Sequence, residues 1–369
     1  MICLHSKNAL KLLSTLLIGS SLAVAPMGYA QEGAENAAAA EKAKAGPGAL
    51  DEISGKGRVI AEGVRQERFF GMDFLGDQGI VVGNFGQVMI TEDGGETWVE
   101  EKAPTDLALL AVALHEGGAI AVGQQGLVLL RSPDGEWQEV SVDTGERLLN
   151  VAANRDGEAV IVGAFGTLLA SSDGGRNWAN VAPQWAELAA SANVPADTTG
   201  ATAEPSMYDA KVFDDGVMLI AGELAYVLRS EDGGKSWEFA NFAEALAKGE
   251  EATASAAPTI NDIQVRADGT GFAVGQSGVV FKTNDSGRSW KKLSTPLTEI
   301  NLLAVASRGS GAVIAVGMRS AIFSEDDGEN WQTLEALDLD INWYSAIQVA
   351  PDASQMLAVG HSGRIIGLQ

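Results

Sequence analysis

The sequence has few of the residues that most often carry out chemistry. It holds one cysteine, Cys3, and three histidines among 369 residues. Cys3 lies ahead of the apolar run near the start, so the rest of the chain offers no thiol for a disulfide or a thiolate nucleophile. The stability of the fold must therefore come from packing, and thiol chemistry is excluded.

Basic residues are also scarce. Lysine and arginine total 25 against 49 aspartates and glutamates, which gives a formal net charge of −24. An acidic chain repels the phosphates of nucleic acids and of anionic lipids. We therefore exclude a nucleic-acid partner and interpret the charge as an aid to solubility.

Long apolar runs are limited to one, Leu12–Ala25, preceded by Lys7 and Lys11 and followed by Gly28-Tyr29-Ala30. This is the pattern of a secretory signal peptide, and the run is short for a membrane span. We expect a signal peptide over 1–30, a flexible Ala- and Glu-rich linker over 31–56, and export to the periplasm, or to the thylakoid lumen in a photosynthetic host. The alternative is an uncleaved N-terminal anchor. Without residues 1–30, which hold two lysines and no acid, the charge would be −26.

What the sequence has in abundance is one repeated stretch, exemplified by SSDGGRNW at 171–178. The pattern Ser/Thr-x-Asp-x-Gly-x-x-Trp occurs five times, with a shortened copy SPDGEW at 132–137, and six of the eight tryptophans end a copy. A catalytic or metal site is rarely copied along one chain, whereas a turn often is. Glycine supplies positive φ, the carboxylate accepts backbone N–H groups of its own loop, and the tryptophan packs between sheets. The predicted structural pairs are Asp93 and Trp98, Asp134 and Trp137, Asp173 and Trp178, Asp232 and Trp237, Asp285 and Trp290, and Asp326 and Trp331.

A calcium loop is the chemical alternative for these acidic turns. None of the six copies alternates oxygen ligands and then ends in a distant glutamate, and DLDIN at 338–342 lacks both the glycine and the closing glutamate. We therefore predict no metal and no cofactor.

A second marker, a Val/Ala-Gly pair, precedes each box and recurs about every 40 residues. Between the markers run short apolar stretches separated by Gly, Asp and Asn, which are typical of four short strands joined by tight turns. The seven copies are VVGNFG, AVGQQG, IVGAFG, IAGELA, AVGQSG, AVGMRS and AVGHSG. Four-stranded units at this period predict an all-β, seven-bladed β-propeller over 57–369, with Ala-rich inserts at about 183–206 and 242–258 between blades.

The last repeat lacks a box and a fourth strand, whereas GRVIAEGV (57–64) has no partner in the first repeat. We predict that this N-terminal segment completes blade seven and so covers a strand edge. A six-bladed ring with an independent terminal sheet is the alternative architecture.

The turns that follow the Val/Ala-Gly pairs open on the face opposite the boxes, and they differ from blade to blade. This contrast makes them the candidate partner-binding face. Arginine on an acidic protein could recognise a carboxylate or phosphate there; alternatively, the cations pair with local acids such as Asp338 and Asp340. Phe85 and Phe165 are either exposed anchors or packing residues. The candidate residues are Arg65, Arg68, Phe85, Gln125, Phe165, Arg319, His361 and Arg364.

Catalytic residues are hard to find. His115 falls on the box face, and His361 has no nearby serine or cysteine in a nucleophile arrangement. We predict no catalytic residue, although a carboxylate pair for glycoside hydrolysis stays open on composition.

The box together with AVGxxG resembles the Asp-box, or BNR, repeat of two families. Sialidases are one, but the chain has no Arg-Ile-Pro segment and no convincingly placed tyrosine nucleophile. The photosystem II stability/assembly factor-like family is the better match, over about 57–369. That resemblance implies a non-catalytic scaffold that holds a membrane protein or complex, such as a photosystem subunit or an efflux-type transporter, through an arginine patch. The alternative is a glycan-binding or sialidase-like propeller, and the oligomeric state is left open.

Overall fold

The computed structural model of this chain describes residues 57–191, 204–241, 257–297 and 299–369, and these form seven antiparallel sheets of four strands each. The predicted signal peptide (1–30) and linker (31–56) lie outside the described residues, as do the central parts of both inserts. The described helices are too short or too polar to cross a bilayer.

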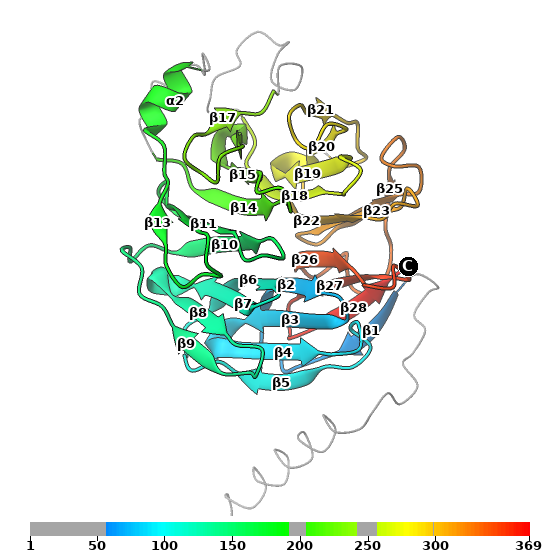
Figure 1. Ribbon diagram of the computed structural model, residues 1–369. Helices are drawn as coiled ribbons and strands as arrows, with labels where there is room; N and C mark the ends of the chain where they lie inside the picture. Colours follow the sequence, from blue (N-terminus) through cyan, green and yellow to red (C-terminus); the bar gives the residue numbers. More distant parts are fainter. Residues whose placement is uncertain (1–56, 192–203, 242–256, 298) are drawn as a thin grey trace, which may run out of the picture. The chain divides into compact units, whose positions relative to one another are not determined.

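The sheets follow one another in chain order as blades 1 to 7 (Figure 1). Blade 1 contains β2 (Phe69–Leu75), β3 (Gln78–Gly83), β4 (Gln87–Thr91) and β5 (Val99–Lys102). Blade 2 contains β6 (Leu109–His115), β7 (Gly118–Gly123), β8 (Val128–Arg131) and β9 (Trp137–Glu139). Blade 3 contains β10 (Leu148–Ala153), β11 (Ala159–Gly163), β12 (Leu168–Ser171) and β13 (Ala179–Asn180). Blade 4 contains β14 (Met207–Val212), β15 (Met218–Gly222), β16 (Val227–Ser230) and β17 (Glu238–Phe239).

Blade 5 contains β18 (Ile260–Val265), β19 (Gly271–Gly275), β20 (Val280–Thr283) and β21 (Lys291–Lys292). Blade 6 contains β22 (Leu302–Ser307), β23 (Val313–Gly317), β24 (Ala321–Ser324) and β25 (Gln332–Thr333). Blade 7 contains β26 (Tyr344–Val349), β27 (Met356–Gly360), β28 (Ile365–Leu368) and β1 (Gly57–Ala61). Helix α2 (Trp185–Ser191) begins the insert after blade 3, a helix that the sequence pattern did not predict. Short 3₁₀ turns η1 (Asn84–Gly86), η2 (Gln124–Gly126), η3 (Glu223–Ala225) and η5 (Gln276–Gly278) join second to third strands.

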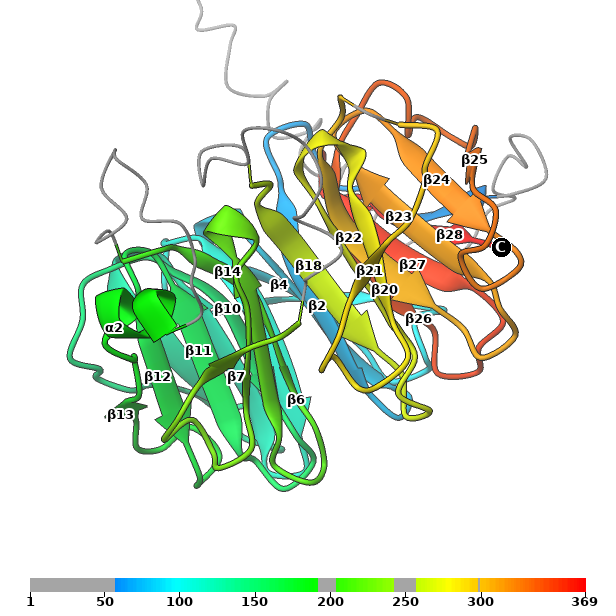
Figure 2. The same cartoon turned by 90° about the horizontal axis from the view of Figure 1, so that it is seen from above.

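The first strand of each blade lies innermost (Figures 1 and 2). Residues of the seven first strands line a central cavity of about 270 Å³. The second strands are buried from their second residue onward, because each one is covered by a neighbouring blade on both sides. In β11, Ala159 and Ile161 pack with blade 2, whereas Val160 and Val162 pack with blade 4. This explains the continuous Val-Ile-Ala runs before each Gly: both faces of these strands are core.

Five of the six predicted boxes share one hydrogen-bond pattern. In blade 4, the buried Ser230 hydroxyl donates to Asp232 Oδ1 at 2.8 Å and accepts from Gly234 N at 2.8 Å. The carboxylate also accepts from Ser236 N (2.9 Å) and Ser236 Oγ (2.7 Å), and these bonds lower the pKa of Asp232 to about 2. The short copy in blade 2 differs: Asp134 is exposed and accepts no hydrogen bond from the described residues, so the structural role predicted for it is wrong. Its turn is two residues shorter, so the residue that donates through both its N–H and its side chain in the other boxes, such as Ser236, has no counterpart.

The box tryptophans each pack against the preceding blade. Trp331 lies edge-on to Phe272 of blade 5, with ring centroids 6.1 Å apart, and Trp237 donates its indole N–H to Val181 O of blade 3 at 2.9 Å. Trp137 keeps this role without a full box, since its indole N–H bonds to Glu101 of blade 1 at 2.5 Å. Each box thus fastens one blade to the blade before it.

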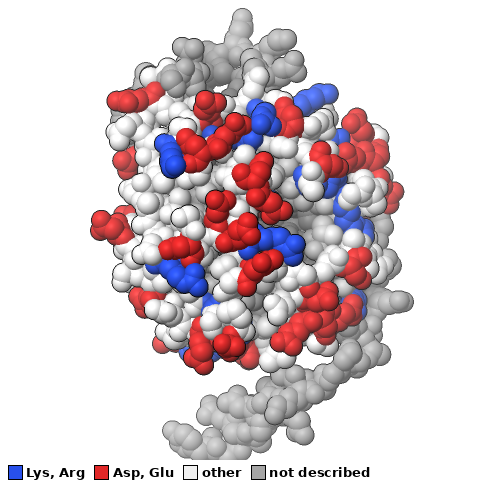
Figure 3. All heavy atoms as spheres, in the orientation of Figure 1, with Lys and Arg blue, Asp and Glu red and all other residues white. Residues whose placement is uncertain are grey.

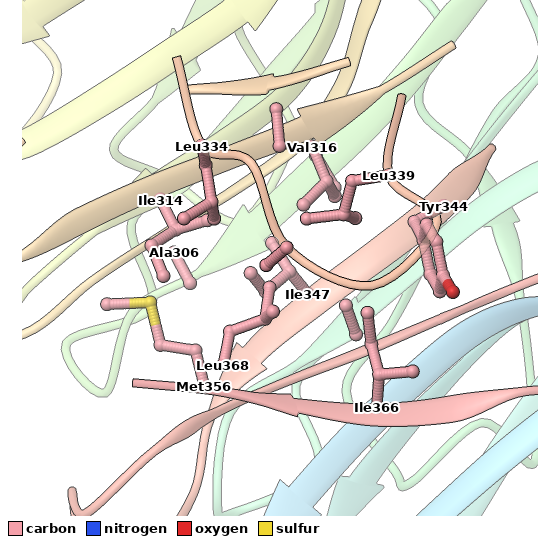
Figure 4. Packing of buried hydrophobic residues seen from close by; sticks show 14 residues of the cluster. Ala306, Ile314, Val316, Leu334, Leu339, Tyr344, Ile347, Met356, Ile366 and Leu368 are labelled. Atoms are coloured by element: carbon pink, nitrogen blue, oxygen red, sulfur yellow. The ribbon is translucent and has the colours of Figure 1, made fainter. Parts of the chain in front are cut away.

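Blade 7 takes its outermost strand from the start of the propeller. β1 runs antiparallel to β28, with Gly57 opposite Leu368 and Val59 opposite Ile366. The blade has no box tryptophan, and its side facing blade 6 is filled instead by the cluster in Figure 4, in which Ile314 and Val316 of blade 6 meet Tyr344, Ile347 and Ile366 of blade 7. The N-terminal segment therefore lies where the sequence pattern placed it.

Removing β1 should destabilise the whole ring, because β28 would lose its partner and the half-buried Val59 and Ile60 would lose their contacts. We expect the free energy of unfolding of a chain that starts at Val64 to be at least ~2 kcal/mol lower than that of a chain that starts at Gly57. Urea denaturation followed by tryptophan fluorescence would measure the difference. Equal midpoints for the two chains would show that ring closure does not depend on β1.

Candidate functional site

The turns between second and third strands share an unusual backbone. The central residue of each turn is not glycine, yet it is left-handed, with φ between 51° and 59°. The seven residues are Phe85, Gln125, Phe165, Leu224, Ser277, Arg319 and Ser362. A side chain in this conformation costs about 1–2 kcal/mol relative to the right-handed one. We call the end of the ring that carries these turns the tip face, and the opposite end the box face.

The tip turns are forced into this shape by the connection that runs beneath them. Gly86, at φ 67°, donates its N–H to Leu107 O at 3.0 Å, and a Cβ on it would lie 2.0 Å from Thr105 O. The glycine is thus held against the link to blade 2, and the residue before it must turn outward. In blade 1 this close approach leaves no room for a Cβ on Gly86, whereas nothing in the turn geometry requires a phenylalanine beside it.

Large apolar side chains stand exposed on the tip face. Phe85 is 60% exposed and Phe165 67%, so both are exposed residues and not packing residues. Met318 (44%), Ile341 (65%) and Val64 (55%) add to them. Ile341 and Val64 were not among the predicted face residues, because they lie in connections between blades, where no repeat pattern marks them.

The predicted cationic residues have different surroundings. Arg65 and Arg319 are exposed and form no ion pair within the described part of the chain. Arg68 donates to the backbone carbonyls of Arg65 (2.7 Å) and Glu67 (2.9 Å). Arg364 and His361 are held inside the ring: Arg364 bonds to Asp338 and Glu62, and His361 is only 8% exposed. For Arg364 the alternative of pairing with Asp338 is therefore the observed one.

Asp338 is the centre of this internal network. Its carboxylate accepts from Tyr344 Oη (2.7 Å), Asn342 Nδ2 (2.7 Å) and Arg364 Nη1 (2.5 Å). Burial alone would raise the pKa of Asp338, but the Tyr344 hydrogen bond and the charge of Arg364 outweigh it, and its pKa is lowered. His361 Nε2 lies 2.9 Å from the same carboxylate without the alignment of a hydrogen bond, and burial lowers the pKa of this imidazole, which keeps it neutral near pH 7.

This network joins three distant segments. Arg364 links Glu62, just after β1, at 2.8 Å to the connection between blades 6 and 7. His361 and Arg364 are consequently structural parts of ring closure, and the prediction that they face a partner is wrong for the buried His361. The reason is that Asp338, 23 residues earlier in the chain, folds back over them.

Blades 6, 7 and 1 form one continuous sector of the tip face. Arg319 N donates to Asn342 O at 2.8 Å, and Met318 and Arg68 make isolated bridges to Trp343 and His361. Phe70 stacks on Trp343 with centroids 6.2 Å apart. We call Arg65, Phe85, Met318, Arg319 and Ile341 the blade 6–7–1 surface. It combines exposed apolar side chains with two arginines that form no ion pair with the described residues. The chain as a whole has an excess of acid, and Asp and Glu are plentiful on the face drawn in Figure 3.

The remaining predicted tip residues lie elsewhere on the ring. Gln125 is the exposed tip of blade 2. Phe165, the tip of blade 3, borders a hollow of about 400 Å³ that is also lined by Trp185 of α2.

The central cavity holds three carboxylates that the sequence pattern did not single out. Asp73, Asp209 and Asp262 each accept a backbone N–H from the next blade: Leu114 at 2.7 Å, Ile263 at 2.8 Å and Val305 at 2.7 Å. Asn150 of blade 3 also donates to Asp209. The sequence does contain a sign of these carboxylates: they are polar residues at the alternate, inward-facing positions of first strands that are otherwise apolar.

Burial changes the protonation of these carboxylates. It raises the pKa of Asp73 and of Asp262 to about 6, although the N–H bonds oppose it. Burial, followed by the charge of neighbouring Asp262, raises the pKa of Asp209 well above its usual value. Lys211 is the cation that faces Asp73 and Asp262. All three carboxylates bond to the backbone of the adjacent blade, which is a structural use, and the described residues hold no group of three His, Cys, Asp or Glu that could bind a metal.

The fold defines the class: this is a seven-bladed β-propeller. The family described as photosynthesis system II assembly factor YCF48 matches residues 131–247, about a third of the chain. Among solved structures, YCF48 from Cyanidioschyzon merolae superposes with a TM-score of 0.64 at 18% identity, covering 85% of this chain and 99% of that one. The chain is thus a seven-bladed β-propeller that is similar in fold to YCF48.

Two further structures superpose similarly. YCF48 bound to a D1 peptide gives a TM-score of 0.60 at 19% identity, covering 87% of this chain and 98% of that one. The GH74 xyloglucanase from Xanthomonas campestris gives 0.61 at 18% identity, covering 84% of this chain but 52% of the enzyme. At these identities the likeness concerns the fold. No curated protein matches the sequence significantly.

The raised pKa values predict an unusual pH dependence of stability. Between about pH 4 and 6 the folded ring binds more protons at Asp73, Asp209 and Asp262 than the unfolded chain, so stability is largest below this window and falls as pH rises through it. The box carboxylates act oppositely: their lowered pKa values mean stability is lost as pH falls below about 4. We expect greatest stability near pH 4–5 and a fall toward pH 7.

The variant Asp262→Asn isolates the first effect, because it keeps the shape and removes the charge. Its free energy of unfolding should fall less between about pH 4 and 7 than that of the unaltered chain, by on the order of 2 kcal/mol. Urea titrations at each pH would give the values. Asp352→Asn, on an exposed turn, is the matched control, and identical slopes for all three proteins would show that the central carboxylates ionise normally.

Proposed function

We propose that this protein is a non-catalytic binding scaffold that is exported and holds a segment of a membrane protein during assembly, in the manner of a photosystem II assembly factor. The blade 6–7–1 surface is the proposed binding site. The thylakoid lumen or the periplasm is the proposed compartment, on the basis of the N-terminal pattern.

The observation that carries the proposal is the combination of strain and exposure at the tips. Phe85 and Arg319 occupy a left-handed backbone that glycine would adopt at no steric cost, and both residues are exposed, Phe85 by 60%. Large, exposed side chains retained at such positions are typical of binding loops on a rigid scaffold.

The comparisons support the same reading. The matched family is described by an assembly function, and one superposable YCF48 structure is bound to a peptide of D1. The comparisons do not support an efflux-type transporter as the partner. The chemistry of the surface fits an apolar segment with a carboxylate nearby, since Arg65 and Arg319 flank Met318 and Ile341.

A glycan-active propeller is the second candidate, and the GH74 superposition is the observation in its favour. Glycoside hydrolysis needs one ionised and one protonated carboxyl group on either side of a substrate. The central carboxylates are engaged by backbone N–H groups of neighbouring blades instead, which favours the scaffold.

Replacing Phe85 by glycine separates binding from folding. We expect Phe85→Gly to unfold at the same temperature as the unaltered chain or higher, because the substitution relieves up to ~1 kcal/mol of backbone strain. The variant should no longer capture the membrane protein. Arg319→Glu should also lose it, by reversing the charge of the surface. Ser277→Gly is the matched control, because it removes the same strain from blade 5 and should retain binding.

The assay can exploit the lack of cysteine after residue 3. In a Cys3→Ser background, a unique cysteine at Ser362 carries a photo-crosslinker into the proposed surface, and one at Ser277 carries it to blade 5. We expect a membrane protein to be cross-linked from position 362 and not from position 277. The cross-linked product should be absent when the chain also carries Arg319→Glu. Equal labelling from both positions, or capture that survives Arg319→Glu and Phe85→Gly, would contradict the proposed surface.

A further inference from the structure

A buried arginine on the box face lacks the partners that its environment demands. Arg229 lies in β16 of blade 4, and its side chain is 9% exposed. Its Nε and Nη1 atoms are buried without a hydrogen-bond partner among the described residues. An unsatisfied buried charged group is costly, and in native proteins it usually marks a bound water or ion.

The repeat supplies an internal comparison, since Lys282 holds the same position in blade 5. Each cation directly precedes its own box and lies opposite a second-strand residue, Leu219 for Arg229 and Phe272 for Lys282. Lys282 Nζ lies 3.0 Å from Asp327 Oδ2 and 3.7 Å from Glu329 Oε1, both in the box of the next blade. A cation at this position is therefore neutralised by the neighbouring box.

The box that faces Arg229 does not supply this charge. It reads TNDSGRSW where the box facing Lys282 reads SEDDGENW, so Ser286 stands in the place of Asp327 and Arg288 in the place of Glu329. Arg229 thus meets a hydroxyl residue and a second cation. Burial, followed by the charge of Arg288, lowers the pKa of Arg229.

One carboxylate partly fills the gap. A single oxygen, Glu231 Oε1, lies 3.0 Å from Arg229 Nη2 and 3.0 Å from Arg288 Nη2. The Glu231 side chain is 63% exposed and Arg288 58%. Ion pairs this exposed contribute little, so Glu231 can leave at small cost. It also uses only one nitrogen of a guanidinium group that can bind an anion with two.

We propose that Arg229 and Arg288 form an oxyanion site between the boxes of blades 4 and 5, and that Glu231 occupies it until a carboxylate or phosphate group replaces it. The ligand bonds to both guanidinium groups and engages the buried edge of Arg229. The group can be a small free anion or an acidic side chain of a partner, because both offer the same oxygens. The site lies on the box face, opposite the blade 6–7–1 surface, and goes beyond the proposed scaffold function.

Titration of the full-length protein with inorganic phosphate, at constant ionic strength and followed by calorimetry, tests the site. Removing the competing carboxylate by Glu231→Gln should tighten phosphate binding about tenfold, if Glu231 fills the site about nine-tenths of the time. Arg229→Met should abolish binding and keep the fold, because an apolar side chain of similar length suits the buried position. The matched control is Lys282→Met, which should leave the phosphate titration unchanged.

A second titration, with N-acetylglutamate, distinguishes the sources. Saturable binding of phosphate alone points to a free anion, and tighter binding of the carboxylate points to an acidic side chain of a partner. Absence of saturable binding by Glu231→Gln to either probe, or binding that survives Arg229→Met, would overturn the proposal. Arg319→Glu should not alter either titration, so this test fails or succeeds independently of the proposed scaffold function.

Discussion

The pairing of β1 with β28 is the constraint on which the rest of the ring depends. A propeller blade has apolar residues on both faces and is stable only between two neighbours. Without a shared sheet, the last blade would have only three strands and its β28 edge would be open. With it, the two ends of the propeller close the ring, and Arg364 reinforces the joint by linking Glu62 to Asp338. Blade 7 lacks a box tryptophan, and the apolar cluster between blades 6 and 7 fastens it to the preceding blade instead.

The two ends of the ring are built by different rules. On the box face, the same hydroxyl, carboxylate and tryptophan recur, because each set fastens a blade to its predecessor. On the tip face, only the backbone recurs, with a left-handed residue in all seven turns. The side chains there vary from Phe85 to Ser277 to Arg319. A scaffold of this kind keeps its geometry while the tips change, which is how a rigid ring can present a particular surface to a partner.

Charge has a structural role in this acidic protein. Carboxylates in the boxes are stabilised by short-range hydrogen bonds and stay ionised, whereas those in the central cavity are desolvated and tend to hold protons. The same residue type therefore contributes in opposite directions as pH changes, according to its surroundings. Where one box differs from the next at its variable positions, as Ser286 and Arg288 differ from Asp327 and Glu329, a neighbouring cation is left incompletely paired. Local departures from a repeat thus reveal chemistry that the repeat itself conceals.

The sequence alone determined the class of fold, because a turn with Asp, Gly and Trp at fixed spacing and a strand that is apolar on both faces leave few other solutions. It also indicated the closing role of 57–64 and the tip face, since both follow from counting strands. The tertiary structure alone decided which candidate residues are available. His361 and Arg364 read like Arg319 in the sequence, yet Asp338 folds over the first two and leaves the third exposed. Asp134 matches the box but lacks its donors, and Asp73, Asp209 and Asp262 line one cavity only because seven first strands converge on one axis. Burial and pairing of a polar side chain depend on segments far away in the chain, and no local pattern contains that information.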